Sequence, residues 1–344
     1  MNSSVSSVKV LVTGANGFIG LHAILRLLHL GFNVRATVRN ETHITKVTET
    51  ISKHIDASKL ELVQADLARD EGWKDALIGC THVIHIASPY VIKNPKDENE
   101  LVFPARDGTL RVLRTAQAEG VKRVVLLSTI GAIFDGHEGE NRTFNENDWS
   151  DLPKTRLIYH KSKTLAELAA WDFIRGLENK SEMEMVSICP SNVFGPVLDG
   201  HHHTSTEWYR TIMHAEVPGI SRTQIDFVDV RDLVEVLVKA LTQTKAAGLR
   251  FICNGASIPL IEFANILHEN FSNRGFRVSN RILPDFVIRF IALFDPKVKA
   301  VARQLQWKYN FSTDQVQSVF GWHPRPYKQT IIDTAESLIE FGIV

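Results

Sequence analysis

The 344-residue chain has little cysteine, no net charge and no long apolar run. Its three cysteines, Cys80, Cys189 and Cys253, lie far apart in apolar segments, so we expect reduced core thiols rather than disulfides or metal ligands. Lys plus Arg and Asp plus Glu both number 39, which argues against nucleic acid or an anionic membrane as a partner. No apolar run reaches the roughly 18 residues of a membrane span, and residues 1–7 lack the apolar core of a signal peptide. We therefore expect a cytoplasmic protein.

The first half of the chain alternates short β-branched apolar runs with amphipathic stretches. We expect strands at residues 8–12, 34–38, 60–65, 82–87, 124–127 and 185–188, and helices at 19–30, 108–119 and 163–175. This alternation predicts an α/β fold, a Rossmann-type doubly wound parallel sheet covered on both faces. The regularity ends after Pro190. We therefore expect a core of residues 1–190 with parts of 220–255, and a smaller C-terminal substrate lobe built from segments of 191–344.

Three glycines separate the first expected strand from the first expected helix. Gly14, Gly17 and Gly20 stand three residues apart, around the start of an apolar-periodic helix that begins with Phe18 and Ile19. Glycine at these positions permits a tight turn, lets backbone N–H groups approach a pyrophosphate, and allows close helix–strand packing. In this context the turn predicts that the core binds a dinucleotide of the NAD(P) type.

The second expected strand ends in a cation, at the place where such sites distinguish NAD from NADP. An acidic residue there would bind the ribose 2′-hydroxyl of NAD, whereas this chain has Arg39, with Lys46 further on. A cation suits a 2′-phosphate, so we expect NADP(H) in preference to NAD(H). Asp66-Leu67, after the third strand, could contact the adenine, and Ala87-Ser88, after the fourth, could lie along the cofactor. Taken alone, each could equally be an ordinary strand end.

Tyr159 and Lys163 stand four residues apart at the start of a helical run. At that spacing the phenol and the ammonium lie on one face of the helix, one turn apart. A neighbouring ammonium favours the phenolate and lowers the tyrosine pKa from its usual value of about 10. Such a phenol can give a proton to a carbonyl oxygen or take one from an alcohol. The pair by itself is also compatible with a solvated helix face, so the rest of the chain has to decide.

The order of these segments resembles that of the extended short-chain dehydrogenase/reductases. The chain continues the series with Ser128-Thr129 after the fifth strand, Pro190-Ser-Asn-Val-Phe-Gly-Pro196, Phe227-Val-Asp-Val-Arg-Asp-Leu233 and Phe320-Gly-Trp322. It is most similar to the dihydroflavonol-reductase-like branch, with which it shares Arg35-Ala-Thr-Val-Arg39, Ser162-Lys-Thr-Leu-Ala-Glu167 and Ala169-Ala-Trp171. That branch holds plant flavonoid reductases and microbial NADPH-dependent aldehyde and ketone reductases.

The resemblance implies an NADPH-dependent reductase that converts an aldehyde or ketone to the alcohol. Tyr159 would be the general acid, and Lys163 would bind the nicotinamide ribose and lower the pKa of the phenol. Thr129 would hold the substrate oxygen, with Ser128 as the alternative hydroxyl. The residues expected to contact the cofactor are Gly14, Gly17, Phe18, Ile19, Gly20, Arg39, Lys46, Asp66, Leu67, Ala87, Ser88, Tyr159, Lys163, Pro190, Asn192, Val193 and Ser205.

Two departures from the resemblance concern the substrate. Plant flavonoid reductases carry an Asn where this chain has Phe134, and a Gln where it has Asp226. The groups expected to hydrogen-bond a polyphenol are therefore missing, and we expect a small to medium, less polar carbonyl compound. The candidate substrate-lining residues are Phe134, Asn192, Trp208 and Met213.

Other functions of the same fold stay open. A sugar-nucleotide epimerase or dehydratase would generally use NAD, which Arg39 argues against. A 3-beta-hydroxysteroid-type dehydrogenase is a further alternative, and a non-enzymatic cofactor sensor would typically have lost Tyr159 or Lys163. We expect no nucleic-acid or membrane partner, no metal, and a monomer or a homodimer.

Two further segments invite other interpretations. His201–His203 suggests a metal, but adjacent residues on a loop rarely converge on one ion, so we expect a polar lip of the substrate cleft. Residues 286–305 have apolar positions at helical spacing, with Arg289, Lys297, Lys299 and Arg303 between them. This pattern is compatible with an interfacial or dimer helix. We expect instead a helix of the substrate lobe packed on its own core.

Overall fold

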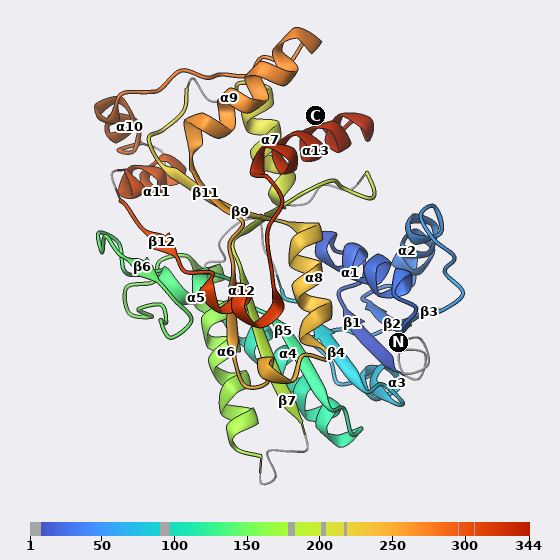
Figure 1. Cartoon of the computed structure of the whole chain (residues 1–344). Coiled ribbons are helices and arrows are strands. Elements are labelled where there is room, and N and C mark those ends of the chain that lie inside the picture. The colour runs from blue at the N-terminus through green and yellow to red at the C-terminus, as the bar shows by residue number, and fades with distance from the viewer. Residues whose placement is uncertain are drawn as a thin grey trace.

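A seven-stranded parallel sheet forms the centre of the computed structural model (Figure 1). The structure describes residues 8–89, 97–177, 183–200, 204–216, 219–294, 296–305 and 307–344, without side-chain detail at 204–206, 296, 297 and 300. In spatial order the strands are β10 (Arg250–Cys253), β7 (Glu184–Pro190), β5 (Arg123–Leu127), β4 (His82–His85), β1 (Lys9–Thr13), β2 (Asn33–Val38) and β3 (Leu60–Gln64). This order and its parallel pairing confirm the expected Rossmann-type sheet.

Helices cover both faces of this sheet. On one face lie α1 (Phe18–His29), α2 (Thr42–Ser52) and α8 (Val230–Ala240), and on the other α3 (Trp73–Leu77), α4 (Asn99–Ala118) and α6 (Ile158–Arg175). Successive side chains of a strand point to opposite faces. In β1, Val10 and Val12 join the core under α1 and α8, whereas Leu11 joins the core under α4 and α6. Strands buried on both sides are therefore largely apolar, as Val10, Leu11 and Val12 of β1 are.

The C-terminal half adds a second region, drawn in the upper part of Figure 1. Its three-stranded sheet of β8 (Asn192–Phe194), β9 (Gln224–Asp229) and β11 (Ala256–Pro259) follows from the carboxyl end of β7. Five helices belong to this region: α7 (Thr204–Met213), α9 (Leu260–Phe271), α10 (Asp285–Ile291), α11 (Pro296–Gln304) and α13 (Tyr327–Glu340). The remaining elements are α5 (Gly131–Phe134), α12 (Asp314–Phe320), the parallel pair β6 (Thr143–Phe144) and β12 (Asn310–Phe311), and 3-10 helices at Thr244–Ala246 and Ser272–Arg274.

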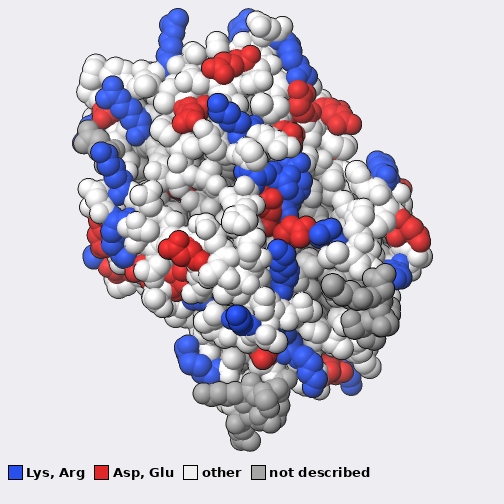
Figure 2. Space-filling view, in the orientation of Figure 1, with Lys and Arg blue, Asp and Glu red and all other residues white. Residues whose placement is uncertain are grey.

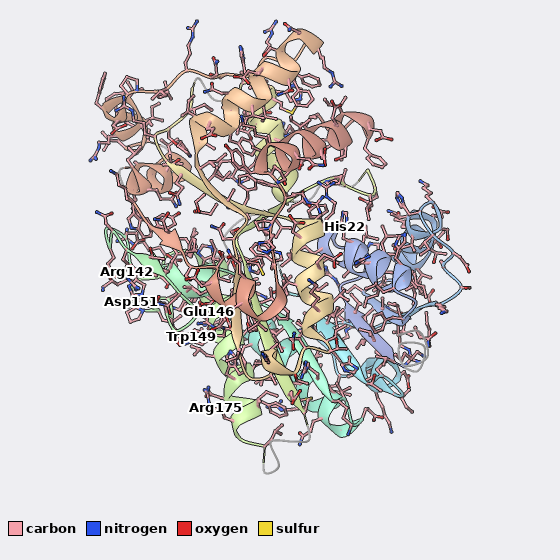
Figure 3. All side chains as sticks on the ribbon, in the orientation of Figure 1. His22, Arg142, Glu146, Trp149, Asp151 and Arg175 are labelled. Atoms are coloured by element: carbon pink, nitrogen blue, oxygen red, sulfur yellow. The ribbon has the colours of Figure 1, made fainter. Side chains whose placement is uncertain are left out.

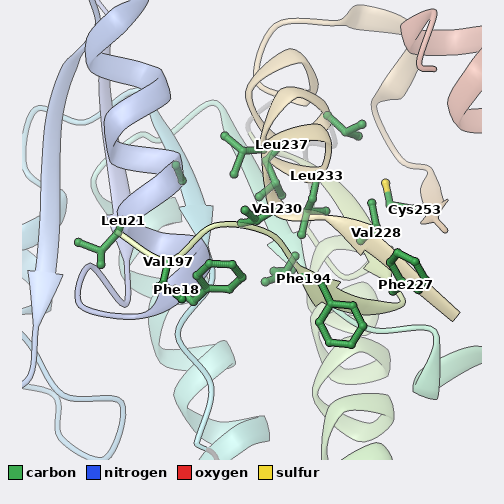
Figure 4. Packing of buried hydrophobic residues seen from close by; sticks show 14 of the residues in the cluster. Phe18, Leu21, Phe194, Val197, Phe227, Val228, Val230, Leu233, Leu237 and Cys253 are labelled. Atoms are coloured by element: carbon green, nitrogen blue, oxygen red, sulfur yellow. The ribbon is translucent and has the colours of Figure 1, made fainter. Parts of the chain in front are cut away.

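One apolar core connects the two regions. Figure 4 shows Phe18 and Leu21 of α1, Leu233 of α8, and Phe194 and Phe227 of the three-stranded sheet, and all five are buried in the same cluster. The helix that follows the glycine turn and the sheet of the C-terminal region are thus held by shared packing. The division of the chain at residue 190 stays a prediction.

Three helical segments differ from the expected boundaries. α4 begins at Asn99 rather than at residue 108 and contains Pro104. Proline normally disfavours the interior of a helix, so the sequence pattern predicts a later start. α6 begins at Ile158, so Tyr159 lies in its first turn. Residues 286–305 form parts of two helices, α10 and α11, rather than one.

Candidate active site

The glycine turn after β1 depends on the absence of side chains. Gly14 has φ +79°, and a Cβ on it would lie 3.2 Å from the backbone of Ala87. A Cβ on Gly20 would lie 2.1 Å from the carbonyl oxygen of Gly14, so only glycine lets α1 start this close to the turn. Gly17 is the N-cap of α1, so the first N–H groups of the helix, which no i−4 carbonyl of the helix can accept, lie beside the turn. This cradle fits a pyrophosphate.

Thr13 fixes the ends of β1 and β4 to each other. Its Oγ1 accepts hydrogen bonds from the backbone N–H groups of Ile86 and Ala87, both at 3.0 Å, and lies 2.8 Å from Nδ1 of His85. Because two N–H donors use the hydroxyl oxygen, its hydrogen points to Nδ1, and the ring proton of His85 is on Nε2. Burial lowers the pKa of His85 to about 3, so the ring is neutral. The strand order reverses between β1 and β4, where folds of this type bind their ligands.

Two exposed cations lie at the adjoining strand end. Arg39 follows β2 directly and Lys46 lies on α2, and within the described ranges neither side chain forms an ion pair. Asp66 follows β3, where its Oδ1 accepts a hydrogen bond from the N–H of Ala68 at 2.9 Å. Leu67 packs against α4, where a Cβ on Gly108 would come within 2.8 Å of it. Arg39 and Lys46 are thus free to bind an anion.

Lys163 is buried at the centre of the site. Its Nζ donates a hydrogen bond to the carbonyl oxygen of Leu127, at the end of β5, over 2.6 Å. Burial lowers the pKa of Lys163 to about 8, although the charge of Glu167 acts to raise it. Tyr159 lies one turn earlier on α6 and is half-buried. The face of α6 that bears Lys163 therefore packs against the end of β5, which leads to Thr129.

Glu167 extends this helical face by one more turn into the core. It is 1% exposed, and its carboxylate accepts hydrogen bonds from Ser128 Oγ at 2.5 Å, Ser187 Oγ at 2.7 Å and Arg250 Nε at 2.8 Å. Burial acts to raise the pKa of Glu167, but Arg250 and the two hydroxyls outweigh it and the pKa is lowered. Glu167 is therefore an ionised carboxylate that joins α6 to β5, β7 and β10.

Arg250 is in turn held by the loop that precedes α6. Its guanidinium lies 3.7 Å from the ring centre of Trp149 and donates to the carbonyl oxygens of Asp148 and Glu146 at 2.7 and 2.8 Å. Figure 3 labels Glu146 and Trp149 beside α6. Every polar group of the Glu167–Arg250 pair thus has a partner, which is the condition under which a buried ion pair is tolerated.

The two candidate hydroxyls after β5 have different environments. Ser128 is buried and gives its hydroxyl hydrogen to Glu167. Thr129 is half-buried, and its Oγ1 accepts a hydrogen bond from the N–H of Gly131 at 3.1 Å. Among the described residues no acceptor takes the hydroxyl hydrogen of Thr129, so it remains available to a substrate oxygen. The geometry favours Thr129 over Ser128.

The turn after Thr129 is packed directly on the start of α6. A Cβ on Gly131 would lie 2.3 Å from the ring of His160, so glycine permits this contact. The Nδ1 of His160 lies 2.9 Å from the carboxylate of Asp135, which fixes the ring. Because His160 follows Tyr159 in α6, this contact packs the turn that bears Thr129 against the helical turn that contains Tyr159.

An aromatic wall continues from this turn. Phe134 stacks on Tyr309 with ring centres 5.3 Å apart, and the Tyr309 hydroxyl donates to Asp226 Oδ2 at 2.9 Å. The carboxylate of Asp226 also accepts hydrogen bonds from Ser257 Oγ and Gln224 Nε2, at 2.6 and 2.7 Å. The two positions that depart from the flavonoid reductases are thus joined through Tyr309. One of these positions, Phe134, carries an aromatic ring. The carboxylate of the other, Asp226, is buried and accepts hydrogen bonds from three side chains.

The remaining predicted contacts differ in outcome. Pro190 and Val193 lie at the carboxyl end of β7 and in β8, and Asn192 between them is exposed, with its amide donating to the carbonyl oxygen of Asp226 at 2.8 Å. Trp208 on α7 is 42% exposed. The prediction that Met213 lines the substrate cleft is wrong, because its side chain is fully buried in the core.

Some sequence predictions fall where the structure gives no detail. The side chain of Ser205 and all of His201–His203 lie outside the described residues. In the described part of the chain no three His, Cys, Asp or Glu side chains are grouped as a metal would require. No helix in that part is long and apolar enough to cross a membrane.

Sequence reasoning did not assign roles to Glu167, Arg250 or Tyr309. Glu167 could have been found, since it repeats the four-residue spacing from Tyr159 to Lys163. Arg250 and Tyr309 could not, because each reaches the site through contacts more than 80 residues apart in the chain. No local pattern marks such partners.

The fold and the glycine turn define a dinucleotide-binding protein of the Rossmann type, and comparison with known proteins gives its family. The profile of the NAD dependent epimerase/dehydratase family matches residues 10–252. Dihydroflavonol 4-reductase of Gerbera hybrida is 32% identical over 272 residues, which are 77% of this chain and 73% of the relative. The corresponding enzyme of Arabidopsis thaliana is 32% identical over 277 residues, 76% of this chain and 69% of the relative.

Solved structures give the same result. A yeast methylglyoxal/isovaleraldehyde reductase complexed with NADPH superposes with a TM-score of 0.80 and 25% identity, over 97% of this chain and 99% of that one. The chain belongs to the NAD dependent epimerase/dehydratase family. This confirms the expected extended short-chain dehydrogenase/reductase, and the chain is an oxidoreductase of that family.

Proposed function

We propose that this protein is an NADPH-dependent reductase of small to medium aldehydes or ketones, with Tyr159 as the general acid. The observation that carries the proposal is the position of Lys163. Its ammonium is buried, is bonded to the strand end that leads to Thr129, and lies one helical turn from Tyr159. A buried ammonium beside a phenol stabilises the phenolate, the form that Tyr159 would take after giving up its proton.

Each residue then has one task in the reduction. The cradle of Gly14 and the N-terminus of α1 would hold the cofactor pyrophosphate. Bound NADPH supplies a hydride to the carbonyl carbon. Thr129 donates a hydrogen bond to the carbonyl oxygen, Tyr159 gives that oxygen a proton, and Lys163 stabilises the phenolate that remains. The reductase names of the relatives support this direction.

Two features support the proposed cofactor and substrate. Arg39, directly after β2, and Lys46, on α2, are exposed and form no ion pair among the described residues, so both could bind a 2′-phosphate. The NADPH in the yeast structure agrees with this preference. The ring of Phe134 and the fully bonded carboxylate of Asp226 offer no free polar group to a polyphenol, so a less polar carbonyl compound is the better substrate.

The test is the oxidation of NADPH by the purified protein with a panel of aldehydes, ketones and diketones. We expect turnover with at least one apolar carbonyl compound and a loss of about a hundredfold or more in Tyr159→Phe, since a general acid contributes a factor of this size. Tyr327→Phe is the matched control, because Tyr327 is half-buried in the first turn of another helix, α13. If no carbonyl compound is reduced, or if Tyr159→Phe keeps the full rate, the proposed function is wrong.

A further inference from the structure

Helix α10 and the turn that follows it expose four large apolar side chains. Phe286, Phe290, Leu293 and Phe294 are 73%, 63%, 75% and 76% exposed. The expectation that residues 286–305 pack on their own core is therefore wrong for this face of the segment. We call these four residues the α10 patch. A cluster of this kind on a surface is typical of an interaction site.

The patch consists of one side of a short helix and the turn that follows it. Phe286 and Phe290 stand four residues apart on one side of α10. Leu293 and Phe294 lie in the turn that follows, and the rings of Phe290 and Phe294 contact each other with centres 5.6 Å apart. Ile288, on the opposite side of α10, is buried and anchors the helix to the protein. The apolar face is thus presented outward by a helix whose other face is fixed.

The chain around the patch is rich in cations, although the whole protein has no net charge. Residues 277–308 contain seven Lys and Arg but only two acidic residues, Asp285 and Asp295. Arg281, Arg289, Lys299 and Arg303 are exposed. Figure 2 shows blue groups along the upper-left edge, where Figure 1 places α10 and α11. The patch is therefore an apolar surface with a positive border.

The net charge predicts no membrane partner, but it does not describe this local surface, and we propose that the α10 patch docks on the surface of an anionic lipid bilayer. Its four apolar side chains would enter the boundary between headgroups and acyl chains, and the surrounding cations would bind lipid phosphates. The charge distribution disfavours a second copy of this chain as the occupant. A two-fold contact uses the same surface on both subunits, so Arg289 and its neighbouring cations would face their own copies.

The experiment is sedimentation of the full-length protein with vesicles. We expect binding to vesicles of phosphatidylcholine and phosphatidylserine in a roughly two-to-one ratio, and much less binding to phosphatidylcholine alone. Phe290→Ser with Phe294→Ser should lower the partition coefficient about thirtyfold or more, from the apolar area lost. Arg289→Glu should lower it about tenfold or more on the anionic vesicles, and added salt should weaken it.

Ile78→Ser is the matched control, because Ile78 is also an exposed apolar residue, at the end of α3. It should bind vesicles as the unchanged protein does. All changed side chains are exposed, so melting curves should be unaltered and confirm folding. The proposal is overturned if the unchanged protein does not bind the anionic vesicles, or if Ile78→Ser loses binding as fully as the patch variant. It is also overturned if the protein is a dimer that Phe290→Ser with Phe294→Ser dissociates, since the patch is then a subunit interface.

Discussion

Ser128 gives its hydroxyl hydrogen to the buried carboxylate of Glu167, across 2.5 Å. Two neighbouring hydroxyls at the end of β5 therefore have different roles. Ser128 belongs to the network that fixes α6 on the sheet, whereas no acceptor in the described part of the chain takes the hydroxyl hydrogen of half-buried Thr129. The sequence leaves the choice between them open, and we propose Thr129 as the catalytic hydroxyl because Ser128 already has an acceptor.

The first prediction separates these two hydroxyls. Thr129→Val keeps the shape of the side chain but removes the donor to the substrate oxygen, and should lower kcat about a hundredfold, as loss of an oxyanion donor does. Thr129→Ser should keep most of the activity. Ser128→Ala should reduce the free energy of unfolding by about 1–3 kcal/mol while kcat changes little. Steady-state kinetics measure kcat, and urea unfolding measures the free energy of unfolding. If Ser128→Ala loses more activity than Thr129→Val, Ser128 rather than Thr129 is the catalytic hydroxyl.

The second prediction concerns pH. Lys163 is charged below its pKa of about 8 and neutral above it, so kcat/KM for NADPH should fall as the pH rises through that value. Two buried groups near Lys163 do not change charge there, because burial raises the pKa of Cys189 to about 12 and lowers that of His85 to about 3. Glu167→Gln removes the charge that raises the pKa of Lys163, so the fall should move to lower pH. Glu167→Asp, which keeps the charge, should move it less.

The same variants have a stability readout. Glu167→Gln leaves the buried Arg250 without its counter-charge, so the free energy of unfolding should drop by about 3–5 kcal/mol. The effect of Lys163 itself has a defined sign. Between about pH 8 and 10.5 the unfolded chain binds a proton that folded Lys163 has lost, so this residue's contribution to stability rises with pH in that window and is unfavourable below it. The coupling between Glu167 and Lys163 is contradicted if the pH profile of kcat/KM of Glu167→Gln, corrected for the folded fraction, coincides with that of the unchanged protein.

The third prediction tests the cofactor preference. Arg39→Ala removes a cation that would pair with a 2′-phosphate, and should raise KM for NADPH about tenfold or more while KM for NADH stays within about twofold. Arg175→Ala is the control: Arg175 is an exposed cation at the far end of α6, labelled near the bottom of Figure 3. It should change neither constant. Equal effects of Arg39→Ala on both cofactors would refute the 2′-phosphate contact.

The fold could be predicted from the sequence to a large extent, and for a physical reason. Strands buried on both faces are largely apolar, so β1 and β5 are visible through the apolar runs Val10–Val12 and Val124–Leu127. The start of α4 could not be predicted, because Pro104 disfavours a helix when only its neighbours in the sequence are considered. The outward direction of Phe286 and Phe290 could not be predicted either, because helical spacing defines an apolar face but not what covers it.

By itself the sequence determined the residues whose role is local. Gly14, Gly17 and Gly20 are fixed by the turn they make, and Tyr159 and Lys163 by one turn of helix. Only the tertiary structure decided which hydroxyl is free, that Glu167 and Arg250 pair beneath Lys163, and that Tyr309 joins Phe134 to Asp226. Local geometry depends on neighbours along the chain, which the sequence lists in order. The partners of a buried polar group depend on which distant segments fold against it, and tertiary packing decides which segments these are.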